Sequence, residues 1–124
     1  MASKPKSLVV KWNKLQAARW IKQCIRDGNV RFTSHFFDEA RKDSISTGDA
    51  TECILEGLAA NWEPGEDPAT SLPDMRMRFM LERRTKSLAV VVAVSDHDPD
   101  CIVITTWKLV QKNELVYKND TCIL

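Results

Sequence analysis

His35 is the residue of this chain best placed for acid–base chemistry. It stands two positions after Val30–Thr33, whose alternation of apolar and polar residues predicts a short strand, and it lies where a helix is expected to begin. Such a position beside a sheet edge tends to be exposed. An imidazole, with an ordinary pKa of about 6.5, can give or take a proton at neutral pH. His35 is therefore either a catalytic acid or base, or a residue that only packs or caps.

Arg76 and Arg78 alternate with apolar residues in Met75–Leu81 and so share one face of a predicted strand. Residues i and i+2 of a strand are about 7 Å apart, so two guanidinium groups can clamp one phosphodiester through bidentate hydrogen bonds. The alternative is an ordinary exposed sheet face. Thr106 and Lys108, on the last predicted strand, are expected to border the same face as substrate-binding residues, although Lys108 can equally be a plain surface lysine.

Arg31 and Thr33 face the same way in the first predicted strand and are two further candidates for substrate contact. The chain has no phosphate-cradling glycine loop, no G-x-S-x-G and no H-E-x-x-H, which excludes nucleotide-driven enzymes and the common hydrolases. Its four cysteines include no C-x-x-C pair, and with the two histidines they lack the spacing of a zinc site. We expect no metal and no cofactor.

The elements before His35 are expected to be a tail and one amphipathic helix. Residues 1–12 form either a basic tail or a short edge strand. Asn13 is a good N-cap with Gln16 as its capping-box partner, and Gly28 suits a helix end, so the pattern predicts a helix over residues 13–27.

Two short helices are expected after the first strand. One starts near His35 and ends at Asp43–Ser44, and the next begins at Ser46, whose capping-box acid is Asp49. Gly57 helps to end this helix. Its buried stripe is predicted to be Ala50, Cys53, Ile54 and Leu58.

The second half of the chain predicts a sheet. Asn61–Asp74 is rich in proline and acidic residues and is expected to be a loop. Met75–Arg84, Leu88–Val94 and Cys101–Leu109 follow as antiparallel strands, with a turn at Thr85–Ser87 between the first two, and residues 110–124 form a C-terminal extension. The fold class expected is α+β, with the N-terminal helices packed on one face of an antiparallel sheet, in a single domain over residues 13–109.

Composition fits an ordinary globular protein of 124 residues with one core. No apolar run approaches the roughly 20 residues that span a bilayer, and no signal-type run follows the N-terminus, so we expect a cytoplasmic protein without membrane contact. Residues 1–31 carry eight basic residues and one acid, although the whole chain has a net charge of only +1. This basic arm suits contact with phosphates, or it is a solvated helix face.

A motif of helix, G-x-(I/V)-x-F-T-x-H, basic segment and I-S-x-x-D runs through the first half of the chain. Nine residues carry it: Gly28, Val30, Phe32, Thr33, His35, Ile45, Ser46, Asp49 and Ala50. This pattern resembles a bacterial family of small RelE/BrnT-like domains, and the resemblance extends over about Ala17–Lys108. Family members commonly carry an arginine one helical turn after the histidine, where this chain has Glu39.

The resemblance to the RelE and BrnT toxins implies a RelE-like fold and metal-independent cleavage of RNA. In that reaction a ribose 2′-hydroxyl attacks its own phosphate. His35 would be the general base or acid, and Arg76 and Arg78 would stabilise the charge that develops on phosphorus. RNA would be the substrate, and a cognate antitoxin or immunity protein the partner.

Two functional hypotheses follow. The first is a toxin-like ribonuclease held in check by a partner protein. The second is a non-catalytic relative, such as a phage anti-defence inhibitor, that binds a target protein through its acidic surface, because acidic side chains can occupy a phosphate-binding groove. Asp38, Glu39 and the acidic residues between positions 63 and 74 supply that surface.

Overall fold

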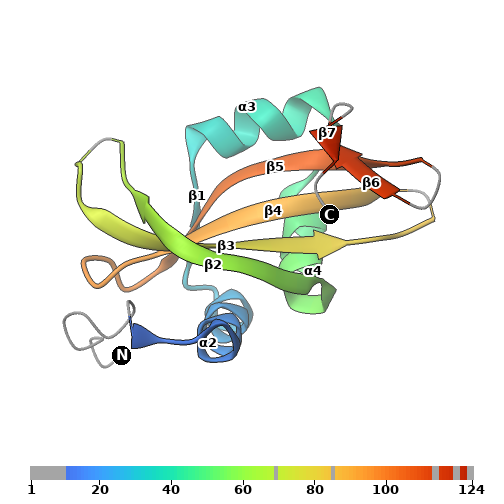
Figure 1. Ribbon diagram of the computed structural model, residues 1–124. Coiled ribbons are helices and arrows are strands. Elements are labelled where there is room, and N and C mark those ends of the chain that lie inside the picture. Colours follow the sequence, from blue (N-terminus) through green and yellow to red (C-terminus); the bar gives the residue numbers. More distant parts are fainter. Residues whose placement is uncertain (1–10, 69, 85, 113–114, 119–120, 123–124) are drawn as a thin grey trace.

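The computed structural model describes residues 11–68, 70–84, 86–112, 115–118 and 121–122, with side chains described only as far as Leu109. Three helices precede a mainly antiparallel sheet and pack against it (Figure 1). Buried residues of all three helices join those of the central strands in a single core cluster. The expected α+β class is confirmed. The RelE-like assignment stays a prediction.

The first helix, α2 (Lys14–Asp27), begins and ends where the sequence predicts. Asn13 caps it, with a backbone-to-side-chain bond in each direction between Asn13 and Gln16. Gly28 ends it in the left-handed conformation, with φ of 79°, which glycine adopts without steric cost. The buried side of α2 consists of Ala17, Ala18, Ile21, Cys24 and Ile25.

Strand β1 (Val30–Phe32) leads directly into helix α3 (Ser34–Lys42). Thr33 joins the two: its Oγ1 accepts the Phe36 N–H at 3.0 Å and donates to the Ile104 carbonyl at 2.8 Å. One hydroxyl therefore both caps α3 and fixes the start of that helix to the last long strand of the sheet.

Helix α4 (Thr47–Glu56) is capped by Ser46 with Asp49 in a capping box, as predicted. The Ser46 backbone N–H that donates to Asp49 lowers the pKa of this carboxyl. Ala50, Cys53 and Ile54 are buried as expected. Leu58 was also expected in this stripe, and that prediction is wrong: Leu58 is 77% exposed, because it opens the next strand.

Strands β2 (Leu58–Glu66), β3 (Pro73–Leu81), β4 (Ser87–Val94) and β5 (Cys101–Lys112) follow one another antiparallel in that order. β1 pairs with β5 in parallel, so the sheet is mixed rather than purely antiparallel. β6 (Leu115–Lys118) and β7 (Thr121–Cys122) continue beyond β5. The predicted tail lies outside the described residues up to residue 10, as do positions 113–114, 119–120 and 123–124 of the predicted extension.

The predicted loop Asn61–Asp74 is wrong over most of its length. β2 occupies it as far as Glu66, and β3 begins at Pro73, which leaves only a short connection. Pro64 and Gly65 are tolerated because β2 is the edge strand. Proline has no backbone N–H, and on the outer side of an edge strand there is no neighbouring strand that would need this donor.

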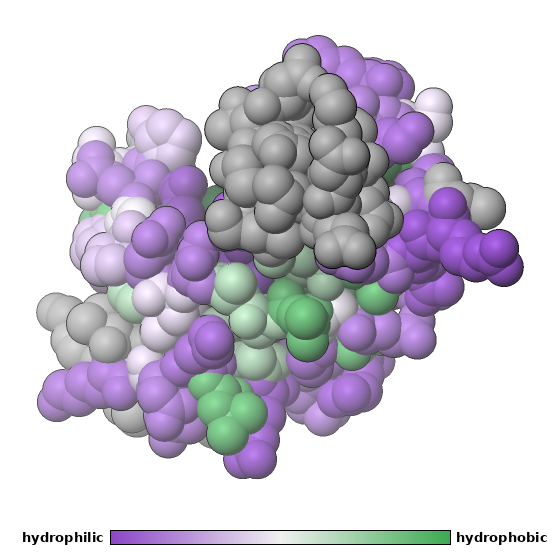
Figure 2. All heavy atoms as spheres, turned by 45° about the vertical axis from the view of Figure 1, so that its right-hand side comes forward, coloured by the Kyte–Doolittle hydropathy of each residue, from purple (hydrophilic) through white to green (hydrophobic). Residues whose placement is uncertain are grey.

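The sheet has a core face and an open face. Met75, Met77 and Phe79 of β3 are buried in the helix-covered core, as predicted, so Asp74, Arg76, Arg78 and Met80 alternate onto the open face. A smaller buried cluster on that face joins Ala89, Trp107 and Leu109 to the partly buried Met80 and Val91. Viewed as spheres, the molecule shows apolar side chains gathered in a patch near the centre of one face, with hydrophilic side chains to its left and right (Figure 2).

A bulge in β5 overturns the prediction that Thr106 and Lys108 share a face with Arg76 and Arg78. Pairing with β4 shifts between Val103 and Thr105, so alternation reverses at this point. Thr106 therefore turns to the core side and is 1% exposed. None of the described helices is long and apolar enough to cross a membrane.

Candidate functional site

A cavity of about 380 Å³ lies over the open face, beside the first turn of α3. The β2–β3 connection closes one side of it with Asp67 and Pro68, and Asp74 and Arg76 of β3 stand at its wall. Its floor is apolar and consists of Ala93 from β4 with Ile102 and Ile104 from β5. This volume is within the range of small-molecule pockets, about 300–1,000 Å³.

The N-terminus of α3 faces this cavity. Thr33, Ser34 and His35 all line it, and the His35 side chain is exposed. Among the described residues, no hydrogen bond partner is found for the backbone N–H groups of Ser34 and His35. Free N–H groups at a helix N-terminus carry partial positive charge and favour an anion. His35 therefore lies where the backbone already attracts negative charge.

Arg76 lines the same cavity but is not a free clamp. Its Nε donates to Asp74 Oδ1 at 3.0 Å, and its Nη2 donates to Asp74 Oδ2 at 3.3 Å and to the Glu66 carbonyl at 2.7 Å. The Asp74 side chain is only 8% exposed. The ion pair holds the guanidinium in one orientation and leaves Nη1 as the nitrogen without a hydrogen bond among the described residues.

Gly65 leaves room for this arrangement, because it lies opposite Asp74 on the neighbouring strand β2, on the side where the Arg76–Asp74 pair lies. A Cβ at position 65 would lie 2.4 Å from Arg76 Nε and 2.7 Å from Asp74 Oδ1. We expect Gly65→Ala to displace the guanidinium and lower the free energy of unfolding by about 1 kcal/mol. Chemical denaturation measures the loss, and the Arg76 Nε–H proton in an NMR spectrum reports the ion pair. Unchanged stability together with a preserved Nε–H signal would show that the contact is not needed.

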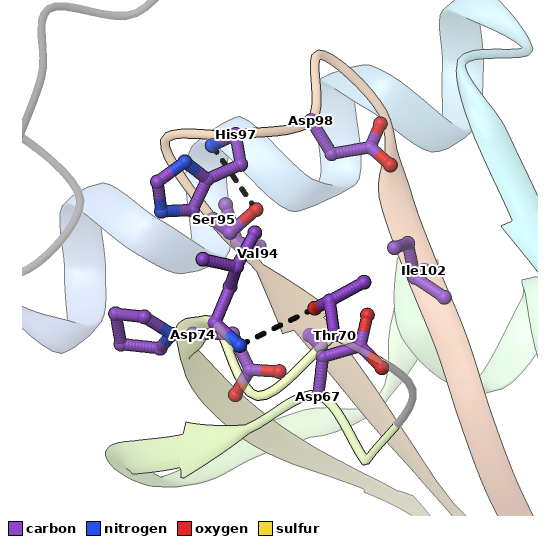
Figure 3. Close-up of a pocket in the computed structure, with 11 residues that line it drawn as sticks. Asp67, Thr70, Asp74, Val94, Ser95, His97, Asp98 and Ile102 are labelled. Carbon is purple, nitrogen blue, oxygen red and sulfur yellow. Dashed lines mark hydrogen bonds between the residues drawn. The ribbon is translucent and has the colours of Figure 1, made fainter.

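A second cavity of about 150 Å³ adjoins the first and shares Asp67, Asp74, Ala93 and Ile102 with it. Figure 3 shows His97, Ser95 and Asp98 of the β4–β5 turn on one side of this cavity, across from Asp67 and Asp74. Carboxylates and hydroxyls make up its polar lining apart from His97, and apolar residues such as Leu72 and Val94 line the rest. In the described part of the chain, no three histidine, cysteine or acidic side chains come together in a way that could hold a metal ion.

The structure brings together three of the seven predicted site residues: His35, Arg76 and Thr33 line one cavity. Thr33 is engaged as the cap of α3, so it is a positioning residue. Arg78 shares the open face with Arg76 but is not among the described residues that line the cavity. The predicted clamp of two arginines on one phosphate is therefore not formed at this site.

The other three predicted residues lie elsewhere. Arg31 forms an ion pair with Asp98 in the β4–β5 turn. Thr106 is buried and donates to the Ala89 carbonyl at 2.8 Å, which excludes it from substrate contact. Lys108 is exposed, and its backbone N–H donates to Asp43 at 2.9 Å. The bulge in β5, which was not predicted, takes both Thr106 and Lys108 off the face that carries Arg76 and Arg78.

None of the three described cysteines is suited to act as a nucleophile. Cys24, Cys53 and Cys101 form no disulfide among the described residues, and all three are buried in the core. Burial raises the pKa of Cys53 to about 12. The pKa of Cys101 is raised as well. The larger cause is its side-chain hydrogen bond with Cys24, and the second is burial. Thiols that stay protonated are poor nucleophiles, so these three act as core residues.

Sequence reasoning missed Asp67 and Asp74 as cavity residues. The position of Asp74 could have been predicted, because it stands two residues before Arg76 and residues at this spacing lie on the same face of a strand. Asp67 had none, because its place depends on where β2 ends.

The chain matches none of the protein-family models, curated proteins or solved structures against which it was compared. The resemblance to RelE/BrnT-like domains therefore rests on the motif residues themselves.

Proposed function

We propose that this protein is a metal-independent ribonuclease of the toxin type. One observation carries the proposal: His35, the N-terminus of α3 and Arg76 line the same cavity. A proton-transfer group, free backbone N–H groups and an oriented cation around one space are what cleavage of a phosphodiester without a metal requires.

The reaction uses the ribose 2′-hydroxyl as nucleophile. Its oxygen bonds to the adjacent phosphorus while the bond from phosphorus to the 5′-oxygen breaks, which leaves a 2′,3′-cyclic phosphate and a 5′-hydroxyl. The Asp67 carboxylate takes the proton of the 2′-hydroxyl, and His35 gives a proton to the leaving 5′-oxygen. Arg76 Nη1 and the N–H groups of Ser34 and His35 stabilise the charge that develops on the phosphate.

A ribonuclease of this kind has to be restrained in the cell that makes it. We therefore include in the proposal a cytoplasmic site of action and a cognate antitoxin or immunity protein. An inhibitor that places a carboxylate near Arg76 and the start of α3 would occupy the position of the substrate phosphate.

The purified protein should be incubated with single-stranded RNA in the presence of a metal chelator. We expect cleavage to fragments that end in 2′,3′-cyclic phosphate and begin with 5′-hydroxyl, identified by mass spectrometry. DNA of the same sequence lacks the nucleophile and should stay intact. Uncut RNA, or fragments that begin with 5′-phosphate, would contradict the proposal.

A second candidate function is favoured by the Arg76–Asp74 pair. Asp74 already neutralises Arg76, and Asp67 adds a second carboxylate to the cavity. A non-catalytic module could use these acids to bind a basic side chain of a target protein, as an inhibitor does. Expression in bacteria separates the two: the ribonuclease should halt growth, and the His35→Ala variant should not. The binding module should be harmless in both forms.

A further inference from the structure

Arg78 is an arginine for which the described residues provide neither a hydrogen-bond acceptor at Nε nor a carboxylate partner. Its Nε is buried and has no hydrogen-bond partner. No ion pair is found for it among the described residues, whereas Arg31, Arg41, Arg76 and Arg83 each contact a carboxylate. A desolvated donor without an acceptor costs free energy, which a ligand that supplies the acceptor would recover.

Among the side chains that the structure describes, none offers Arg78 Nε an acceptor. On the open face it stands between Ala60 of β2 and Val91 of β4, with Met80 two residues along its own strand. The carboxylate on the same face of β3, Asp74, is engaged by Arg76. Glu63 is opposite Arg76 on the edge strand and is exposed, and no ion pair joins it to either arginine. The described side chains therefore leave the Arg78 Nε–H free to donate to an acceptor on a ligand.

Arg78 also continues a row of positive groups. It follows Arg76 at the i+2 position of one strand face, a step of about 7 Å, and Arg76 borders the cavity that the N-terminus of α3 faces. A guanidinium suits the bidentate recognition of phosphate. A row of positive groups along one strand matches a polymer with regularly repeated negative charge better than a single carboxylate.

We propose that Arg78 binds the backbone phosphate next to the one held at the cavity, so that the substrate is single-stranded RNA lying along β3. This inference rests on the proposed ribonuclease function and names its substrate class. A cavity of about 380 Å³ is in the size range of sites for one small molecule, which suits a single unpaired nucleotide rather than a duplex. Small side chains beside the path, Ala60 and Ala93, leave room for the strand on the open face.

The test is a binding measurement that does not depend on cleavage. Fluorescein-labelled single-stranded RNA of ten nucleotides is titrated with the His35→Ala protein, and fluorescence anisotropy is followed at several salt concentrations. Adding Arg78→Met should weaken binding at least about tenfold. It should also reduce the slope of log affinity against log salt by about 0.7, because one phosphate contact is lost. Arg84→Met removes the same charge from an exposed position in the β3–β4 connection and is the matched control.

Arg78→Met should fold normally, because it replaces a buried unpaired donor with an apolar chain of similar length. Arg78→Lys keeps the charge without the guanidinium fork, and its affinity should lie between the other two. Equal affinity of the Arg78→Met and Arg84→Met proteins would overturn the inference. So would loss of binding to a poly-glutamate peptide in Arg78→Met with RNA binding unchanged, because the natural occupant would then be a protein carboxylate. RNA binding that depends on Arg78 without any cleavage by the wild type would refute the ribonuclease alone.

Discussion

Replacing His35 by alanine is expected to reduce RNA cleavage by about 10²–10⁴-fold, the range found when a general acid or base is removed. The His35 side chain is exposed, so the loss cannot come from a disrupted core. Thr33 and not His35 supplies the cap of α3, so the helix itself should be unaffected. Initial rates on a fluorogenic RNA oligonucleotide measure the effect, and circular dichroism checks that the variant is folded.

His97→Ala provides the matched control, because it removes the other histidine of the chain. His97 is also exposed, and it lines the adjoining cavity rather than the one beside α3. We expect this variant to cleave RNA at close to the wild-type rate. Equal losses in the two variants, or full activity in His35→Ala, would remove His35 from the mechanism.

Gly57→Ala is expected to lower the free energy of unfolding by about 3 kcal/mol, at the upper end of the range for overpacking. Gly57 ends α4 where this helix meets β3. A Cβ at this position would lie 2.3 Å from the Cys53 carbonyl oxygen and 2.6 Å from the Met80 carbonyl oxygen. Both are backbone atoms held in regular structure, so neither can move aside as a flexible side chain would. Urea denaturation of the purified variant measures the loss.

Gly48→Ala is the matched control, because it makes the same substitution at the other end of α4, where no such contacts arise. Gly48 is exposed in the first turn of α4, and its Cβ would meet only the Ser46 Oγ at 3.5 Å, an ordinary contact. Alanine is the better helix former, so we expect this variant to be more stable by roughly 0.5 kcal/mol. If Gly57→Ala proved as stable as Gly48→Ala, the close packing of α4 on β3 would be contradicted.

Features that depend on neighbours in sequence could be predicted from the chain alone. Asn13 and Ser46 cap their helices with the partners that the capping box requires, three residues on. Met75, Met77 and Phe79 point to the core because alternation fixes the face of each strand residue. The position of His35 near the start of a helix followed from the strand that ends just before it.

Features that depend on distant parts of the chain could not be predicted in this way. The β5 bulge moved Thr106 into the core, and the edge position of β2 turned a proline-containing segment into a strand. The pairing of β1 with β5 in parallel sets the start of α3 beside the open face. The same long-range packing placed Asp67 in the cavity. The site is therefore a product of topology, although its histidine is visible in the sequence.

The central claim is that His35 and Arg76 act on one phosphate across one cavity. A double-mutant cycle on RNA cleavage tests it most directly, with His35→Ala, Arg76→Met and the combined variant measured under single-turnover conditions. Groups that act as a unit lose their effect together, so the combined variant should be scarcely slower than the slower single variant. Losses that multiply in the combined variant would contradict the claim, because the two side chains would then act independently.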